Sequence, residues 1–290
     1  MISESIRKKV KKLRIISYHK ATELMAGFYH SAFKGQGLEF EEVREYQPGD
    51  DIRNIDWNVT AKTGKPFIKL FREERELTVI FLVDVSASTF FGSNILKKDY
   101  IAEICAVLSF AAITNNDKVG IILFSDTIEK FIPPRKGRKS AVRVLQEILS
   151  FKPHYGKTNL KMALEFTNKV CRKKSIVFII SDFFASDYEK ELSLLASKHD
   201  IIGIMVNDIL EEKTLKSGII PVQDIESGKI ILVDMENENT QKFLVRKIKS
   251  TQEYNKKLFK RIGKDFLTLT VGEDYLKKIL ELFRLRERRL

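Results

Sequence analysis

The stretch Leu77-Thr78-Val79-Ile80-Phe81-Leu82-Val83, which runs directly into Asp84-Val85-Ser86-Ala87-Ser88, decides the fold class of this chain. Its first seven residues are mostly apolar and rich in β-branched side chains, which is typical of a strand buried on both faces. The runs Val119–Phe124 and Ile176–Ile180 have the same character, and helical patterns separate the three. Strands that alternate with helices predict an α/β fold with a doubly wound, mostly parallel sheet.

The chain before this domain divides into two segments. Residues 1–34 are predicted to be a helical segment, because Ile6, Val10, Leu13 and Ile16 recur at helical spacing among basic residues. This helix either lies on a membrane surface or, as we favour, packs against its own domain. Residues 35–76 combine glycine turns, aromatic residues and dense charges of both signs, which predicts a small β-rich module. The α/β domain then spans residues 77–290.

One smaller element follows the second buried run. Residues 127–132 are predicted to form an edge strand that ends at Pro133-Pro134, because proline cannot donate a hydrogen bond to a neighbouring strand.

The composition limits the functional class. Of the 290 residues, 43% are hydrophobic and 31% are charged, so the chain is able to form a substantial core. The net charge of +12 is compatible with nucleic acid, an anionic membrane face or an acidic protein. The basic residues are spread along the chain and are not interleaved with aromatic residues, so we expect no dedicated nucleic-acid site.

The cysteines and the hydropathy indicate a compartment. Cys105 and Cys171 lie among apolar residues, so they read as core side chains in a reducing environment. The N-terminus lacks the apolar core of a signal peptide, and no apolar run approaches the length that spans a bilayer. We therefore expect a cytoplasmic protein without a transmembrane segment, for which peripheral membrane contact remains possible.

Three segments carry the residues that could bind a metal ion. They lie directly after the first buried strand, just before the helix that begins near Leu160, and directly after the strand that ends at Ile180. Ligands of open α/β sheets bind at the carboxyl ends of the strands, where all three segments should meet. The candidate ligands are Asp84, Ser86, Ser88, Thr158 and Asp182.

Carboxylates and hydroxyls are the oxygen ligands that suit Mg²⁺ or Mn²⁺. With only two carboxylates, the metal would remain electrophilic and would accept an acidic oxygen from a partner. The same five residues resemble the metal-ion-dependent adhesion site (MIDAS) of von Willebrand factor A domains, in which Asp-x-Ser-x-Ser is followed by Thr and then Asp. The structural alternative is that the two aspartates cap helices while the serines form a turn.

A longer resemblance lies upstream. The stretch from Gly37 to Trp57, GLEFEEVREYQPGDDIRNIDW, is similar to the signature of the DUF58 family, and the match continues at 60–62, 71–74 and 282–286. That family joins this segment to a von Willebrand factor A-like domain. The resemblance implies a cytoplasmic protein that works with a MoxR-type AAA+ ATPase, in a chaperone-like or complex-maturation role.

Within this signature, acidic and basic residues are predicted to form an ion-pair network around Tyr46 and Trp57 that holds the module in place. Alternatively, Arg44, Arg53 and Trp57 present a docking face, because Arg and Trp are frequent anchors of protein interfaces.

Two functional hypotheses follow. The first is a metal-dependent protein-interaction module that is not an enzyme. The second is a Mg²⁺-dependent phosphohydrolase or nuclease built on Asp84 and Asp182. A haloacid-dehalogenase-type site needs a second Asp two residues after the first, where this chain has Ser86. A two-metal site needs more clustered carboxylates. We therefore favour the interaction module, with no catalytic residues and no nucleotide site.

Overall fold

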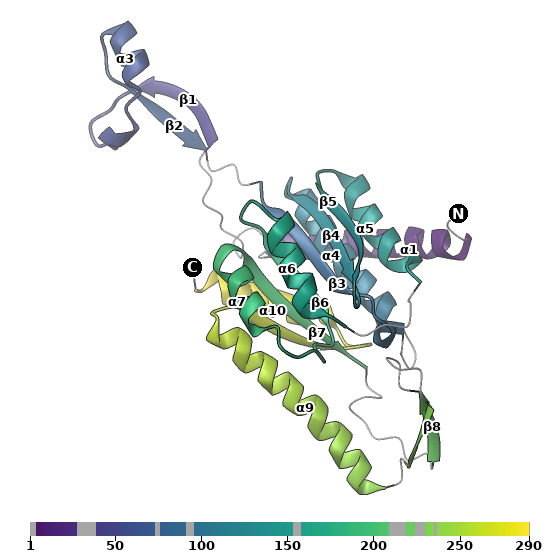
Figure 1. Cartoon of the computed structure of the whole chain (residues 1–290). Coiled ribbons are helices and arrows are strands. Elements are labelled where there is room, and N and C mark those ends of the chain that lie inside the picture. Colours follow the sequence, from purple (N-terminus) through teal and green to yellow (C-terminus); the bar gives the residue numbers. More distant parts are fainter. Residues whose placement is uncertain are drawn as a thin grey trace. The chain divides into compact units, whose positions relative to one another are not determined.

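A computed structural model of the chain describes its elements as two compact units, Met1–Ala32 with Leu77–Leu290, and Phe33–Glu76. Each unit is described by itself below (Figure 1). The prediction of three segments from the sequence remains a prediction. The described residues are 4–27, 39–72, 76–90, 96–152, 158–208, 219–223, 230–234 and 237–289.

The first unit is built on a six-stranded sheet with the order β10-β7-β6-β3-β4-β5. All neighbouring strands are parallel except β4 and β5. The mostly parallel α/β fold predicted from the sequence is therefore confirmed. The strands are β3 (Thr78–Asp84), β4 (Lys118–Phe124), β5 (Ile128–Arg135), β6 (Ile176–Ser181), β7 (Asp200–Asn207) and β10 (Asp265–Thr270).

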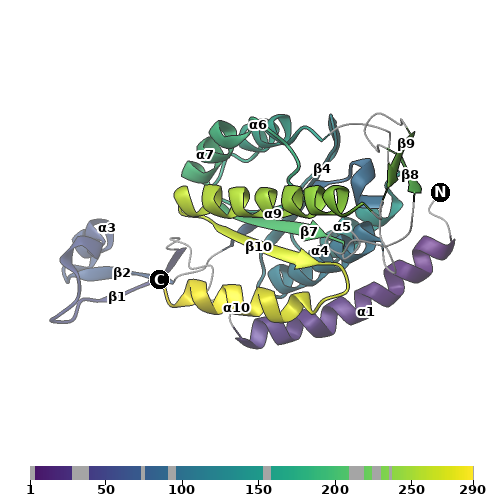
Figure 2. The same cartoon turned by 90° about the horizontal axis from the view of Figure 1, so that it is seen from below.

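Helices cover both faces of this sheet (Figure 2). One face packs against α6, α7 and α9 through a core that includes Leu82, Ile179, Leu164, Leu192 and Phe259. The other face is covered by α4, α5 and α10, with α1 packed on α4 and α5. The helices are α1 (Glu4–Gly27), α4 (Lys97–Thr114), α5 (Arg138–Ser150), α6 (Leu160–Val170), α7 (Glu189–Lys198), α9 (Glu238–Arg261) and α10 (Tyr275–Glu287).

The N-terminal helix α1 packs on α4 with its narrow apolar face. Val10, Ala21 and Leu24 are buried there, while Lys9 pairs with Asp99 of α4. Where the structure describes the chain, no helix is long and apolar enough to cross a bilayer. A separate hairpin, β8 (Ile219–Gln223) with β9 (Ile230–Asp234), is antiparallel.

The edge strand β5 differs from its prediction, because it continues through Pro133 and Pro134 to Arg135. Both prolines lie on the last strand of the sheet order, where amide groups on the outer side have no neighbouring strand to bond. The prolines therefore do not end the strand. Instead they leave an edge that is poorly suited to pairing with another sheet.

The second unit pairs β1 (Glu39–Glu45) with β2 (Phe67–Arg72) in an antiparallel ribbon. Between them lie a short 3-10 helix (Ile52–Asn54) and α3 (Trp57–Thr63), which the sequence analysis did not predict. The Asp56 carboxylate accepts hydrogen bonds from the first amide groups of α3, and Gly64 ends the helix in the left-handed conformation at φ 71°. These two residues are the signal that would have revealed the helix.

Candidate metal centre

Asp84 lies at the carboxyl end of β3 and is only 1% exposed. Its Oδ1 accepts the Ser86 N–H at 2.9 Å, and its Oδ2 accepts the Ser181 hydroxyl at 2.8 Å. The Thr158 hydroxyl lies 3.4 Å from the same Oδ2. Three chain segments that are far apart in sequence therefore meet at one carboxylate.

The serines after β3 are held in a tight turn. The Ser86 and Ser88 Oγ atoms lie 3.0 Å apart, so the two side chains point to the same region. Thr89 closes the turn, because its N–H and its hydroxyl both donate to the Ser86 carbonyl, at 3.1 and 2.8 Å. This turn opens the short 3-10 helix Ala87–Phe90.

Thr158 lies close to the site because hydrogen bonds hold both the backbone and the side chain of its neighbour, Asn159. The Asn159 N–H donates to the Ser125 carbonyl, just past the end of β4, at 2.8 Å. The Asn159 side chain caps α6 by accepting the Met162 N–H at 3.0 Å. The start of α6 is therefore tied to the carboxyl edge of the sheet, and Thr158 is brought beside Asp84.

Asp182 follows β6 and is 8% exposed. Its Oδ1 accepts the Phe184 N–H at 3.2 Å. Between them, Phe183 has a φ of 57°, in the left-handed region that a bulky residue rarely adopts. The Phe183 ring is buried against Phe259 and Phe266, with centroids 5.9 and 5.3 Å away. Aromatic packing therefore holds the strained turn that places Asp182 at the sheet edge.

Burial and charge act together on Asp84. Burial raises the pKa of its carboxyl to about 6, and repulsion from Asp182 adds to this rise. Hydrogen bonds from Ser86 and Ser181 oppose the rise. Among the residues that the structure describes, neither Asp84 nor Asp182 forms an ion pair with Lys, Arg or His. Within the described chain, the two buried carboxylates thus repel each other without a basic side chain to balance them.

The donor set suits a hard cation. It consists of two carboxylates and three hydroxyls, and all of these donors are oxygen atoms. Within the described part of the chain, no group of three or more His, Cys, Asp or Glu residues could hold a metal. A metal here would therefore depend on hydroxyls and on ligands from outside the chain. The structure places Asp84, Ser86, Ser88, Thr158 and Asp182 at the carboxyl edge of the sheet, and their role as metal ligands remains a prediction.

Ser181 is the residue that sequence reasoning left out of the site. The register pairs Val83 with Ile180, so the next residues along the two strands, Asp84 and Ser181, lie side by side. The Ser181 hydroxyl donates to Asp84 and accepts the Phe183 N–H at 3.0 Å. Its signal was its position directly before Asp182, at the end of a buried strand.

The proposed docking residues all lie in the second unit. Arg44 holds Asp50 through two hydrogen bonds, at 2.9 and 2.7 Å, and this guanidinium lowers the pKa of the Asp50 carboxyl. Arg53 pairs with Asp51 on the surface, at 2.8 Å. Trp57 is 70% exposed. The acidic and basic residues thus form separate local pairs rather than a network around Trp57, and Glu74 lies outside the described residues.

Residues 42–254 match the family model described as "Protein of unknown function DUF58". The chain belongs to this family. The match includes Arg44, Arg53 and Trp57 of the second unit and also Asp84 to Asp182 of the first. Relatives include the proteins Rv1480 of Mycobacterium tuberculosis and Mb1516 of Mycobacterium bovis, both described as uncharacterized. Each is 29% identical over 222 residues, which cover 75% of this chain and 70% of the relative.

Several solved structures are similar to this DUF58 protein at low identity. BatB from Bacteroides thetaiotaomicron has a TM-score of 0.47 at 16% identity, and covers 73% of this chain and 99% of its own. The VWA domain of SpRpn10 has a TM-score of 0.39 at 10% identity, over 72% and 95%. The mussel byssus protein PTMP1, solved with a zinc-occupied MIDAS motif, has a TM-score of 0.38 at 17% identity, over 73% and 47%. Because these TM-scores are below 0.5, the fold assignment rests on the strand order of the DUF58 chain itself.

Proposed function

We propose that this DUF58 protein is a metal-dependent protein-interaction module. In this proposal Mg²⁺, or Mn²⁺ in its place, is held at the carboxyl edge of the sheet and accepts an acidic side chain from a partner protein. The residues that would hold the metal are Asp84, Ser86, Ser88, Thr158 and Asp182.

One observation carries the proposal. Asp84 and Asp182 are both buried and repel each other, the Thr158 and Ser181 hydroxyls lie against Asp84, and within the described chain neither carboxylate pairs with a basic side chain. Buried carboxylates are normally paired with a basic group or a metal, because a lone buried charge is costly. A bound divalent cation would neutralise the pair and would serve as an electrophilic anchor for an incoming carboxylate.

The exposure of the site supports a role in binding. Asp84 and Ser86 are buried, whereas Ser88 and Thr158 are partly exposed. A cation above these residues would be reached from solvent on one side only. Since Mg²⁺ favours six oxygen ligands, that side would leave positions for water or for a partner's carboxylate.

The partner is proposed from the resemblance to the DUF58 family. We propose a cytoplasmic complex with a MoxR-type AAA+ ATPase, in which the metal site engages an acidic residue of the ATPase or of a client. A chaperone-like or complex-maturation role would follow from such a complex. The exposed Trp57 and Arg53, together with the partly buried Arg44, offer a second contact on the other unit.

Metal binding is tested by titrating Mg²⁺ and Mn²⁺ into the metal-free protein and following heat release and melting temperature. We expect binding that Asp84→Ala and Asp182→Ala abolish. Glu253→Ala is the matched control, because Glu253 is an exposed carboxylate on α9. Unchanged Mg²⁺ and Mn²⁺ binding by Asp84→Ala would refute the site.

The interaction is tested with a purified MoxR-type ATPase from the same genome, in Mg²⁺ and in EDTA. We expect a complex that forms with wild type and Glu253→Ala in Mg²⁺, and that is lost in EDTA and in Asp84→Ala. A complex that persists with Asp84→Ala would show that the metal site is not the contact. Turnover of phosphate esters or single-stranded DNA that Asp84→Ala abolishes would instead support the phosphohydrolase or nuclease alternative.

A further inference from the structure

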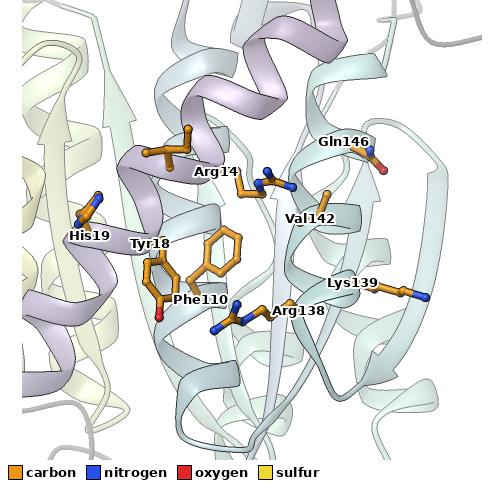
Figure 3. Close-up of a pocket in the computed structure, with 9 residues that line it drawn as sticks. Arg14, Tyr18, His19, Phe110, Arg138, Lys139, Val142 and Gln146 are labelled. Atoms are coloured by element: carbon orange, nitrogen blue, oxygen red, sulfur yellow. The ribbon is translucent and has the colours of Figure 1, made fainter.

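A groove of about 720 Å³ lies between α1 and α5 in the first unit. Figure 3 shows Arg14 and Tyr18 of α1 on one side, Arg138 and Val142 of α5 on the other, and Phe110 of α4 between them. The volume is within the range of sites that bind ligands or peptide side chains.

Positive charge lines this groove without a balancing carboxylate. Arg14, Arg138 and Lys139 all contribute to its lining, and none of the described residues that line it is Asp or Glu. Among the described residues these three form no ion pair, although Arg138 lies over the Tyr18 ring with its guanidinium carbon 5.3 Å from the centroid. By contrast, Lys20 on the same helix α1 pairs with Glu103 at 2.8 Å.

Apolar side chains lie next to these cations. Ile15 is 52% exposed and Tyr18 is 41% exposed, and both line the groove with Phe110 and Val142. Large exposed apolar side chains that adjoin basic groups are typical of a protein interface, where aromatic residues and Arg are enriched. The groove therefore offers contacts to an apolar side chain and to negative charge at the same time.

The groove lies away from the candidate metal centre. Helix α4 starts beyond the carboxyl end of β3 and runs back towards the amino edge of the sheet. Phe110 lies thirteen residues after its first residue, Lys97. Helix α5 begins just after β5, which runs antiparallel to β4 and so ends at the opposite edge from Asp84. Arg138 and Phe110 thus lie towards the amino edge of the sheet, whereas the metal centre lies at the carboxyl edge.

We propose that this groove binds an acidic peptide segment of a partner protein, and that the segment inserts a large apolar side chain between α1 and α5. Complementary charge selects an acidic partner. A second copy of this chain, with a net charge of +12, is repelled. The apolar residues line a hollow between two helices, which suits an inserted segment better than a flat bilayer.

The test uses a fluorescein-labelled peptide of about four helical turns. Leu and Phe recur in it at helical spacing, and Glu and Asp occupy positions between them. Its anisotropy is followed on addition of the full-length protein. The double variant Arg14→Glu/Arg138→Glu reverses two of the three cations that line the groove. Lys12→Glu/Lys257→Glu is the matched control, because it changes the net charge equally at exposed positions outside the groove. Val142→Trp fills the groove and leaves every charge in place.

We expect Arg14→Glu/Arg138→Glu and Val142→Trp each to weaken binding by about tenfold or more, and the control to stay within about threefold of wild type. EDTA and Asp84→Ala should leave the affinity unchanged, which separates this site from the metal centre. Circular dichroism verifies that each variant is folded. If the charge-reversed double variant does not fold, Val142→Trp still tests the groove.

Four outcomes would overturn the proposal. They are no binding of the acidic peptide, equal loss in the groove and control double variants, full affinity of Val142→Trp, and equal binding of a control peptide in which Gln and Asn replace every Glu and Asp. Vesicles of phosphatidylcholine and phosphatidylglycerol form a further arm. Tighter binding to these vesicles than to the peptide, lost in Arg14→Glu/Arg138→Glu, would assign the groove to lipid instead.

Discussion

Asp84→Asn is expected to stabilise the metal-free protein near neutral pH while it removes the response to Mg²⁺. The Asp84 carboxyl is buried beside Asp182, and its pKa is raised from 3.8 to about 6. The folded protein therefore binds more protons than the unfolded chain between these values. Its free energy of unfolding falls as pH rises through this window, and the loss is complete above about pH 6.

The size of the effect follows from the rise in pKa. A rise from 3.8 to about 6 corresponds to a destabilisation on the order of 3 kcal/mol once Asp84 is ionised. Asn removes the charge and keeps an oxygen to accept the Ser86 N–H. Its amide nitrogen replaces the oxygen that accepts the Ser181 hydroxyl, so that serine must turn its hydrogen elsewhere. A net gain of about 1–3 kcal/mol is expected, or roughly 2–8 °C in melting temperature for a unit of this size.

The assay is thermal unfolding in EDTA and in saturating Mg²⁺, at about pH 5 and about pH 8. In EDTA at the higher pH, Asp84→Asn should melt above wild type, and the difference should shrink at the lower pH. Mg²⁺ should raise the melting temperature of wild type alone. Glu253→Gln serves as the isosteric control at an exposed carboxylate. The reasoning is refuted if Asp84→Asn melts at or below wild type in EDTA at pH 8, or if Mg²⁺ stabilises both proteins equally.

Three further predictions concern the first unit. Burial lowers the pKa of His199 below 6.5, and the positive charges of Lys198 and Lys264 add to this effect. The free energy of unfolding should therefore fall as the pH drops below that value. In urea titrations at several pH values, His199→Gln should flatten this dependence. Arg286→Met removes the ion-pair partner that Asp200 and Asp265 share, and it should lower the free energy of unfolding by about 3 kcal/mol. Arg289 is more exposed, so Arg289→Met should lower it by less than about 1 kcal/mol. Equal losses for the two variants in denaturant titrations would contradict the pairing. Gly120→Ala would place its Cβ 2.8 Å from one backbone oxygen and 2.9 Å from one backbone nitrogen of β5 and should cost about 1–3 kcal/mol by the same measurement.

The sequence predicted the parts of this fold that depend on local pattern. Runs such as 77–83 and 176–180 are mostly or wholly apolar, and a strand of that kind is stable only when both faces are covered, so the parallel sheet followed from them. The side chains directly after these strands, Asp84 and Asp182, then had to lie at one edge. Helix α3 was not predicted, because the dense charges around it suggested strands and turns. Asp56 and Gly64 nevertheless mark its two ends.

Other features depend on contacts between segments that are distant in sequence. Ser181 joins the candidate site because the register of β3 and β6 puts it beside Asp84, and register is set by the packing of whole strands. The rise in the pKa of Asp84 likewise requires burial that no local pattern contains. The groove between α1 and α5 exists only because both helices pack on α4. The sequence by itself thus determined the strands and the residues at their ends, whereas the tertiary structure decided which side chains meet and which charges are left without a partner.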